Sequence, residues 1–397
     1  MIPRPLIRVS IPGEWADGWL YKDHLFLWTA SGELVQSPVE RVIEELRREH
    51  GAEVGLAAQV SLFRNDWKSN GQMAAFAQSP HIRGALREIA DSAASMGTLR
   101  VSMSAFEPVD VEPVPGFVLA VSIYGNHAFI ASSDGLFETS LNPKYLRGDL
   151  ELLPRLDVPV HAVETNYGAV AASAFEEGLL FDRIDFGDGA SWLGGGPLDR
   201  VAEYSRSVSM ASRDLLNFTE ESIPDLYVAD AVHERQSRRS RYPSWQVTSY
   251  HRSSVELSEL TARSLGVSDE HLHTGTIRLM ANSKQRLLYN VDGRLRLLRL
   301  KTLKDIRLEP AGELNVRLDD ITSKGPTDVT ALPLGDGFLL EAQDRVVWIN
   351  AAGVVDVADV ALVNVRTFPN SRHFYDTALA VEEERAVLVG FLDFPRR

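Results

Sequence analysis

The stretch AFIASSDGLFET, Ala128–Thr139, is the part of the sequence that decides the fold. Two short apolar runs flank the dipeptide Asp134-Gly135. This dipeptide is typical of a type I′ turn, because both central positions of that turn need positive φ and its twist matches that of antiparallel strands. The stretch therefore predicts a β-hairpin.

The same layout recurs along the chain. Further copies turn at Ser31-Gly32, Glu177-Gly178, Asp292-Gly293 and Ala352-Gly353, and one without a glycine turns near Glu383. Another apolar run often precedes the hairpin, so each unit predicts three or more short strands. Runs such as LFLW and VVWI are apolar on successive positions, which indicates strands that are buried on both faces.

The spacing of these hairpins predicts the kind of repeat. Gly135 and Gly178 are about 43 positions apart, close to the length of one propeller blade. The intervals Gly32 to Gly135 and Gly178 to Gly293 are more than twice as long, so each is predicted to contain a degenerate blade with inserted structure. Candidate strands are VGLAAQVSLFRND and LRVSMSAF in the first interval, and YSRSVSMAS, DLYVADAV and WQVTSYHR in the second.

In this pattern the hairpins resemble those of the β-propeller superfamily in general, without the periodic signatures of WD40 or kelch repeats. Counting the visible and the hidden units predicts an all-β fold of about seven four-stranded blades, with six to eight possible; the resemblance adds the shape of a propeller. It implies a shape and no specific activity. We expect residues 1–397 to form a single β-propeller domain, closed where the N-terminal strand LIRVSI pairs with the C-terminal hairpin RAVLVGFLDF and hides two sheet edges.

Helical insertions are predicted near residues 37–51, 79–97 and 254–266. In the first, Ser37 is the expected N-cap, Pro38 the first helical residue and Glu40 the partner in a capping box. Two interpretations of these helices stay open. They cover blade edges, or they dock a partner, since loops that project from a rigid scaffold often carry recognition.

Composition limits the function classes. The formal net charge of -14 disfavours binding to nucleic acid or to anionic membranes. Cysteine is absent, which excludes disulfides, thiolate metal sites and cysteine nucleophiles. No apolar stretch is long enough to span a membrane, and the start lacks a signal-peptide pattern. We expect a cytoplasmic protein.

The most unusual segment is HERQSRRSRYPSWQ, His233–Gln246, called here the arginine-aromatic segment. Its candidate binding residues are Arg235, Arg238, Arg239, Arg241, Tyr242 and Trp245. Arginines interleaved with aromatic residues can anchor in an acidic protein partner or stack on bases. Three interpretations stay open: a solvated loop, a protein-docking segment, and a weaker nucleic-acid contact.

Catalytic and metal signals are weak. His271 and His273 beside Asp269 and Glu270 could hold a metal if they lay on a strand, but they precede a strand and read as loop residues. His161 with Glu164 offers no complete catalytic set. The spacing of Asp182, Asp185 and Asp188 fits no calcium loop. No catalytic residue, cofactor or metal ligand is therefore assigned, and a small-molecule ligand stays open.

Two functions follow as expectations. The first is a non-catalytic scaffold that binds another protein through inter-blade loops, inserted helices and the arginine-aromatic segment. The alternative is a hydrolase or lyase with an axial pocket, because propeller channels can gather carboxylates and histidines from several blades. Residues scattered one per blade leave no local motif, so the sequence by itself does not separate the two.

Overall fold

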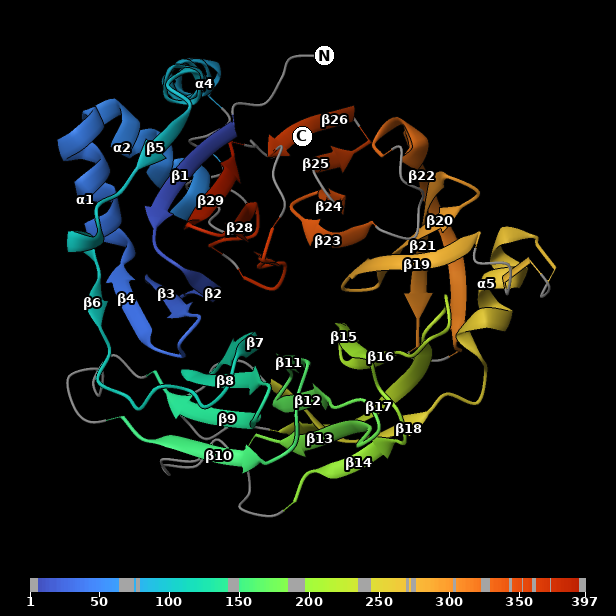
Figure 1. Ribbon diagram of the computed structural model, residues 1–397. Helices are drawn as coiled ribbons and strands as arrows, with labels where there is room; N and C mark the ends of the chain where they lie inside the picture. Colours follow the sequence, from blue (N-terminus) through green and yellow to red (C-terminus); the bar gives the residue numbers. More distant parts are fainter. Residues whose placement is uncertain are drawn as a thin grey trace. The chain divides into compact units, whose positions relative to one another are not determined.

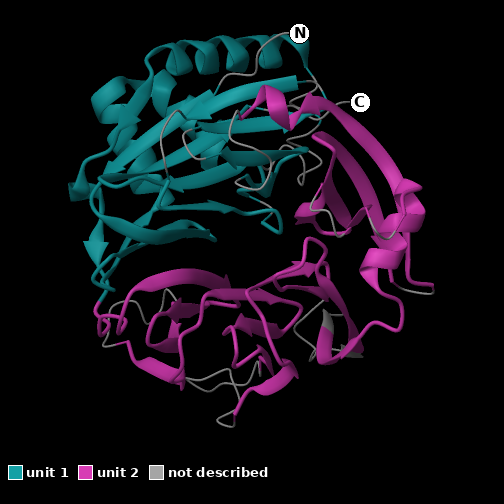
Figure 2. Ribbon diagram, turned by 45° about the vertical axis from the view of Figure 1, so that its right-hand side comes forward, with its two compact units in different colours: residues 1–109, 327–397 teal, residues 110–326 magenta. Residues whose placement is uncertain are grey.

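The computed structural model describes most of the chain, namely residues 6–63, 75, 79–141, 150–184, 197–234, 244–268, 271–272, 276–302, 305–322, 329–342, 345–351, 353–358, 362–371 and 373–392. The chain divides into two compact units, which Figure 2 colours separately: residues 1–109 with 327–397, and residues 110–326. Among the described residues, the first unit contains three β-sheets and the second contains four.

The first unit contains both the first and the last strand of the chain (Figure 1). Its first sheet has the order β2 (Trp15–Tyr21), β3 (His24–Thr29), β4 (Leu34–Pro38) and β6 (Glu107–Pro108). The second is β23 (Thr330–Leu334), β24 (Gly337–Ala342), β25 (Arg345–Asn350) and β26 (Gly353–Ala358). The third is β27 (Asn364–Thr367), β28 (Thr377–Val381), β29 (Arg385–Phe391), β1 (Leu6–Pro12) and β5 (Thr98–Arg100).

The second unit has four sheets of four strands. The first has the order β10 (Leu152–Leu156), β9 (Gly135–Ser140), β8 (His127–Ser132) and β7 (Val118–Tyr124). The next is β11 (Ala162–Asn166), β12 (Ala169–Ser173), β13 (Leu179–Arg183) and β14 (Asp199–Ala202). Then come β15 (Ser207–Ala211), β16 (Asp214–Phe218), β17 (Asp225–Glu234) and β18 (Ser244–Arg252). The last is β19 (Ile277–Ser283), β20 (Arg286–Val291), β21 (Arg294–Lys301) and β22 (Arg307–Arg317).

The central strands of the sheets are buried on both faces. All six residues of β8 are buried, as are all five of β12. Phe129 of β8 shares a core with Val170 of the next sheet, and Ala171 shares another with Leu215 of the sheet after that. Within a unit, successive sheets are stacked through apolar faces in this way, and the seven sheets, six of four strands and one of five, define a seven-bladed β-propeller. This confirms the predicted fold class and blade number.

The third sheet of the first unit joins the two ends of the chain. β1 runs antiparallel to β29, with Leu6 opposite Phe391 and Pro12 opposite Arg385. β5 then pairs in parallel with β1 and covers its outer edge. An open edge strand is a template for aggregation, so this covering protects the blade. The organisation of all seven sheets into a single domain stays a prediction.

One predicted blade is wrong. The interval between Gly32 and Gly135 holds helices, and VGLAAQVSLFRND is not a strand. It overlaps α2 (Ala52–Ala58) and the π-helical turn η1 (Gln59–Phe63), while LRVSMSAF gives only β5 and the short helix η2 (Met103–Ala105). A short apolar run buried on several sides has the same pattern in a strand and in a core helix, which explains the error.

Helix α1 (Val39–His50) also begins differently from the prediction. Ser37 lies in β4 and its hydroxyl donates to the backbone oxygen of Ala105, at 2.8 Å. Pro38 is the N-cap and no side chain caps the helix, so the predicted capping box is absent. The hydroxyl of Ser37 is used to hold the end of the insertion instead. The other helices whose bounds the structure describes are α4 (Pro80–Ser95), α5 (Leu257–Leu265) and the short 3-10 helix η3 (Leu318–Asp320). None of the helices in the described ranges has the length and apolarity to cross a membrane.

The hairpin at Asp134-Gly135 is present, but its turn is not type I′. Neither residue has positive φ, whereas Asp292 and Gly293 have φ values of 51° and 79°, as that turn requires. In the turn at Asp134-Gly135, Ser132 Oγ accepts hydrogen bonds from the backbone N–H groups of these two residues. A Cβ at Gly135 would lie 2.1 Å from the backbone oxygen of Leu156. Glycine is needed here for close packing of β10.

Candidate functional site

The arginine-aromatic segment connects two long strands of the second unit. Its residues Arg235, Arg238, Arg239, Arg241 and Tyr242 lie outside the described residues. Trp245 lies in β18, where it is the register partner of His233 in β17. The role of these six residues in binding stays a prediction.

The strands show on which side of the second unit this segment is attached. The pairing of β16 with β17 ends with Leu215 opposite Tyr227, and β17 then continues to Glu234. The end of β17 therefore lies on the side where β16 begins. On the next sheet, Thr302 directly follows β21 and donates to Asp214 Oδ2, at 2.6 Å, where β16 begins. The end of β21 and the attachment of the segment are thus on the same side.

Four cationic side chains gather at this end of sheet β19–β22. Arg286 of β20 is directly opposite Arg299 of β21. Across the other edge of β21, Arg299 is opposite Glu309, and Lys301 is opposite Arg307. Directly opposed residues, and residues two apart on a strand, share one face of a sheet. Arg286, Arg299, Lys301, Arg307 and Glu309 therefore form one cluster, called here the basic row.

The opposite face of the same strands is apolar and holds them in place. The residues that alternate with the basic row are Leu287, Leu298, Leu300 and Leu308, which are buried in one core cluster. The core includes Leu257 and Leu260 of α5. The leucines fix the register of the strands, because a slip by one residue would exchange the two faces. The position of the basic row thus follows from burial of the leucines.

Glu309 is the single carboxylate of the row. Its Oε2 lies 2.6 Å from Lys301 Nζ, and its Oε1 lies 3.1 Å from Arg307 Nε. The hydrogen bond from Lys301 holds the pKa of Glu309 below its ordinary value, and the charges of Lys301, Arg307 and Arg299 act in the same direction. Glu309 is therefore shared by two cations, and its single negative charge balances only one of them.

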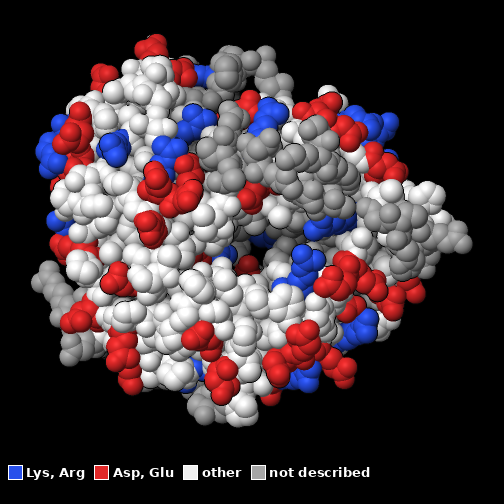
Figure 3. Space-filling view, viewed as in Figure 1, with Lys and Arg blue, Asp and Glu red and all other residues white. Residues whose placement is uncertain are grey.

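The other two cations have no such partner. Arg286 and Arg299 are exposed, and neither makes a hydrogen bond or an ion pair with any part of the chain that the structure describes. Like charges directly opposite each other on paired strands are destabilising. On the face that Figure 3 shows, acidic and basic side chains are interspersed. The basic row is thus a local excess of positive charge on a chain of net charge -14.

A second polar cluster in the same unit is arranged in the opposite way. Glu138 of β9 is fully buried, and its Oε1 lies 2.8 Å from Nδ1 of His127 in β8. Its Oε2 accepts a hydrogen bond from Arg155 Nε in β10, also at 2.8 Å. Both carboxylate oxygens are therefore occupied and shielded from solvent. This arrangement links three strands of one blade, and we interpret it as structural.

The weaker sequence candidates do not assemble into a site. His271 is exposed and its Nδ1 lies 3.2 Å from Ser268 Oγ, while His273 lies outside the described residues. The ring of His161 packs edge-on against Phe175 at 4.1 Å between centroids, and partial burial lowers its pKa. Asp185 and Asp188 also lie outside the described residues. In the described ranges, no group of three or more histidines and carboxylates is placed to hold a metal.

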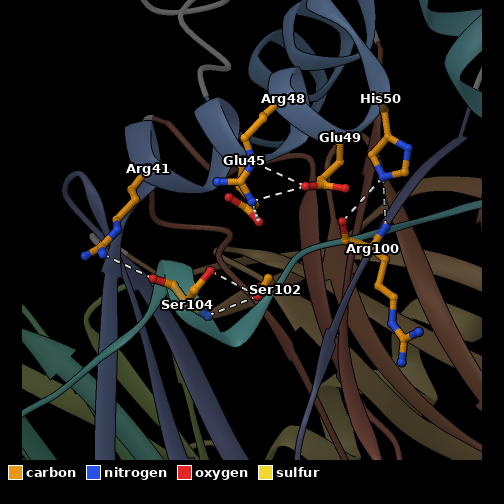
Figure 4. A network of polar contacts seen from close by, with 8 residues as sticks. All are labelled: Arg41, Glu45, Arg48, Glu49, His50, Arg100, Ser102 and Ser104. Carbon is orange, nitrogen blue, oxygen red and sulfur yellow. Dashed lines mark hydrogen bonds and ion pairs between the residues drawn. The ribbon is translucent and has the colours of Figure 1, made fainter.

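The helical insertion of the first unit belongs to the core of that unit. Val42 and Leu46 of α1 pack in one cluster with Ile7 and Val9 of β1. At the surface, polar contacts tie α1 to the segment around β5 and η2 (Figure 4): Arg41 Nη2 donates to the backbone oxygen of Ser104 at 3.1 Å, and Nε2 of His50 lies 3.4 Å from the backbone nitrogen and oxygen of Arg100. These contacts favour the covering role over the docking role.

Sequence reasoning missed the basic row. The run RLRLLRLK, Arg294–Lys301, carries a visible alternation of arginine and leucine, but Arg286 and Arg307 come from other strands. The signal that could have found the row is this alternation combined with the hairpin register, which places Arg286 opposite Arg299. The turn at Asp292-Gly293 predicts the hairpin, but it gives no information about which charged side chains of the two strands face each other.

No protein-family model matches the chain, and no curated protein matches its sequence. Among solved structures, the chain is similar to the β-propeller domain of Cps50 (Swd1) from Myceliophteria thermophila, with 11% identity over 95% of this chain and 96% of that chain and a TM-score of 0.48. It is similar to the computationally designed Ika8 protein, with 8% identity over 96% and 98% and a TM-score of 0.45. A chain in an S. cerevisiae structure of Dbp5 bound to Nup159, Gle1, IP6 and ADP gives 10% identity over 99% and 91% and a TM-score of 0.42. With such scores and identities these similarities carry no functional argument, and the fold is assigned from the sheets.

Proposed function

We propose that this protein is a non-catalytic interaction scaffold that binds an acidic segment of a partner protein. The observation that carries the proposal is the basic row, in which Arg286 and Arg299 are exposed, directly opposed and in no ion pair among the described residues. A partner carboxylate between them would remove their mutual repulsion and form two ion pairs. The arginine-aromatic segment, attached on the same side of the second unit, would add anchoring aromatic residues.

The sign of the charge selects the class of partner. Each exposed ion pair is worth only about 0–1 kcal/mol, so several must act together. The positive charge of the basic row also steers an acidic partner toward this surface, and the acidic remainder of the protein repels the partner from other surfaces. A nucleic acid carries negative charge along its whole length, so the remaining acidic surface would oppose its binding. An acidic protein segment, short and local, fits the basic row better.

The test is a fluorescence anisotropy titration with a labelled twelve-residue peptide of alternating glutamate and serine. An oligothymidylate of equal charge is the second probe. We expect the peptide to bind more tightly than the oligonucleotide, and its affinity to fall with salt. The double variant R286S/R299S should weaken peptide binding about tenfold, because two exposed ion pairs of about 0.7 kcal/mol each are lost.

The matched control is R100S/R263S, which removes two exposed arginines outside the basic row and changes the net charge equally. This control should bind the peptide nearly as well as the native protein. Equal weakening by the two double variants would show a general charge effect and overturn the site. Tighter binding of the oligonucleotide would overturn the partner class. Replacing Arg235, Arg238, Arg239 and Arg241 by serine tests the arginine-aromatic segment separately.

A further inference from the structure

A pocket of about 220 Å³ lies in the first unit, between β26 and the sheet that contains β28, β29 and β1. Its floor is apolar and is lined by Val357, Ala358, Ala380, Val387 and Val389. The three valines are buried members of the core between these two sheets. The pocket is therefore the place where this inter-sheet core opens to the surface, and it can receive an apolar group.

The rim of the pocket is charged, and its carboxylates already have partners. Glu382 accepts a hydrogen bond from Arg385 Nε at 2.5 Å. Asp356 accepts a hydrogen bond from Arg345 Nε at 2.8 Å. Each carboxylate of the lining is thus paired with an arginine from its own sheet. Neither is available to neutralise a further cation without giving up this contact.

That further cation is Arg8 of β1. Its Nε donates to the backbone oxygen of Val357 at 2.9 Å, and its Nη2 donates to that of Asp356 at 3.3 Å. These bonds hold the guanidinium across the gap between the two sheets. Among the described residues Arg8 has no carboxylate partner. An arginine has five N–H donors, so several remain to bind a ligand.

We propose that this pocket binds a carboxylate that carries a short branched apolar group. The carboxylate pairs with the free N–H groups of Arg8, whose orientation is set before binding, and the apolar group covers the valines of the floor. Arginine suits this task because its planar fork matches a carboxylate. The volume is below the range of about 300–1,000 Å³ for ordinary ligand pockets, so the occupant is one side chain or a small acid.

Two sources share this chemistry: a free branched short-chain acid, and the C-terminal residue of a peptide that ends in leucine or valine. Isovalerate represents the first source and N-acetyl-leucine the second. Leucinamide carrying the same N-acetyl group keeps the apolar side chain but removes the negative charge. The inference is independent of the basic row, which lies in the other unit.

The experiment is a titration of the native protein with each of the three compounds, followed by two-dimensional NMR. We expect both acids to shift signals of residues lining the pocket and the amide to bind at least tenfold more weakly, since a hydrogen bond to a charged group is worth more than one factor of ten. Equal binding of N-acetyl-leucine and its amide would overturn the role of Arg8. Failure of both acids to bind would overturn the site.

Variants separate the contributions of charge and space. R8Q should weaken acid binding about tenfold or more, while R100Q, an exposed arginine on the neighbouring strand β5, should leave it unchanged. A380L fills the pocket and keeps Arg8, so it should abolish binding even if R8Q proves poorly folded. Retained binding in A380L would overturn the location. Tighter binding of N-acetyl-leucine than of isovalerate would assign the peptide source, and the reverse order the free acid.

Discussion

The second unit contains two polar clusters that use similar residues in opposite ways. In the buried cluster of His127, Glu138 and Arg155, one carboxylate contacts two partners and little water reaches it. In the basic row, one carboxylate contacts two of the four cations, and the other two, Arg286 and Arg299, are exposed. In the buried cluster both carboxylate oxygens have a partner in the same sheet, whereas the exposed row carries an excess of positive charge.

This difference separates a structural cluster from the binding surface that we propose. A buried charge without a partner costs several kcal/mol, so buried clusters persist only when they are fully paired. An exposed charge is hydrated, and an excess of like charges costs little. Complete pairing therefore points to a structural role, and tolerated excess charge points to a partner that supplies the missing sign.

The largest effect is expected in the buried cluster. E138Q removes the charge that both His127 and Arg155 face, and should lower the free energy of unfolding by about 3–5 kcal/mol, as for other broken buried ion pairs. Urea denaturation measures it. E313Q, in an exposed residue of β22, is the control and should change stability by less than about 0.5 kcal/mol. A loss in E138Q as small as in the control would remove the distinction between the two clusters.

Asp182, whose charge interacts with Arg155 and Glu138 of the buried cluster, should make the stability of the protein depend on pH. Partial burial raises the pKa of Asp182, despite its hydrogen bond from the backbone of Arg183. The folded state therefore binds this proton more readily than the unfolded state, and the native protein gains stability as the pH falls through the raised pKa. D182N, which cannot ionise, should be more stable than the native protein at pH 7.5, and this advantage should disappear in acid.

Urea denaturation of both proteins from pH 7.5 to pH 3.5 follows that difference. D110N, at an exposed aspartate, serves as the control. An advantage of D182N that stays constant with pH would show that the ionisation of Asp182 is not its cause.

The smallest effect on stability is expected in the basic row. R286S/R299S relieves repulsion between two opposed arginines, so the free energy of unfolding should rise by a few tenths of a kcal/mol at low salt. The gain should vanish in about 1 M salt, where exposed charges are screened. A loss above about 1 kcal/mol would mean that these arginines stabilise the blade, and the row would then resemble the buried cluster.

Local sequence patterns predicted some parts of the fold correctly and others not. The repeated hairpins predicted the blades because burial on both strand faces leaves successive apolar residues in the sequence. The same rule failed at residues 54–63, where α2 and η1 are also buried on several sides. At Asp134-Gly135 the predicted hairpin is present, but the predicted type I′ turn is not. Glycine is required there because the backbone oxygen of Leu156 in β10 leaves no room for a Cβ.

By itself, the sequence determined the all-β class, a repeat of about seven blades and the acidic character of the protein, because hydrophobic periodicity, turn residues and net charge are local or additive properties. Only the tertiary structure decided which charges meet. Arg286 and Arg299 are brought together by strand register, and Arg8 reaches Val357 only because the first strand joins the last blade. Electrostatic energy depends on distances between side chains, and those distances exist only once the strands have paired.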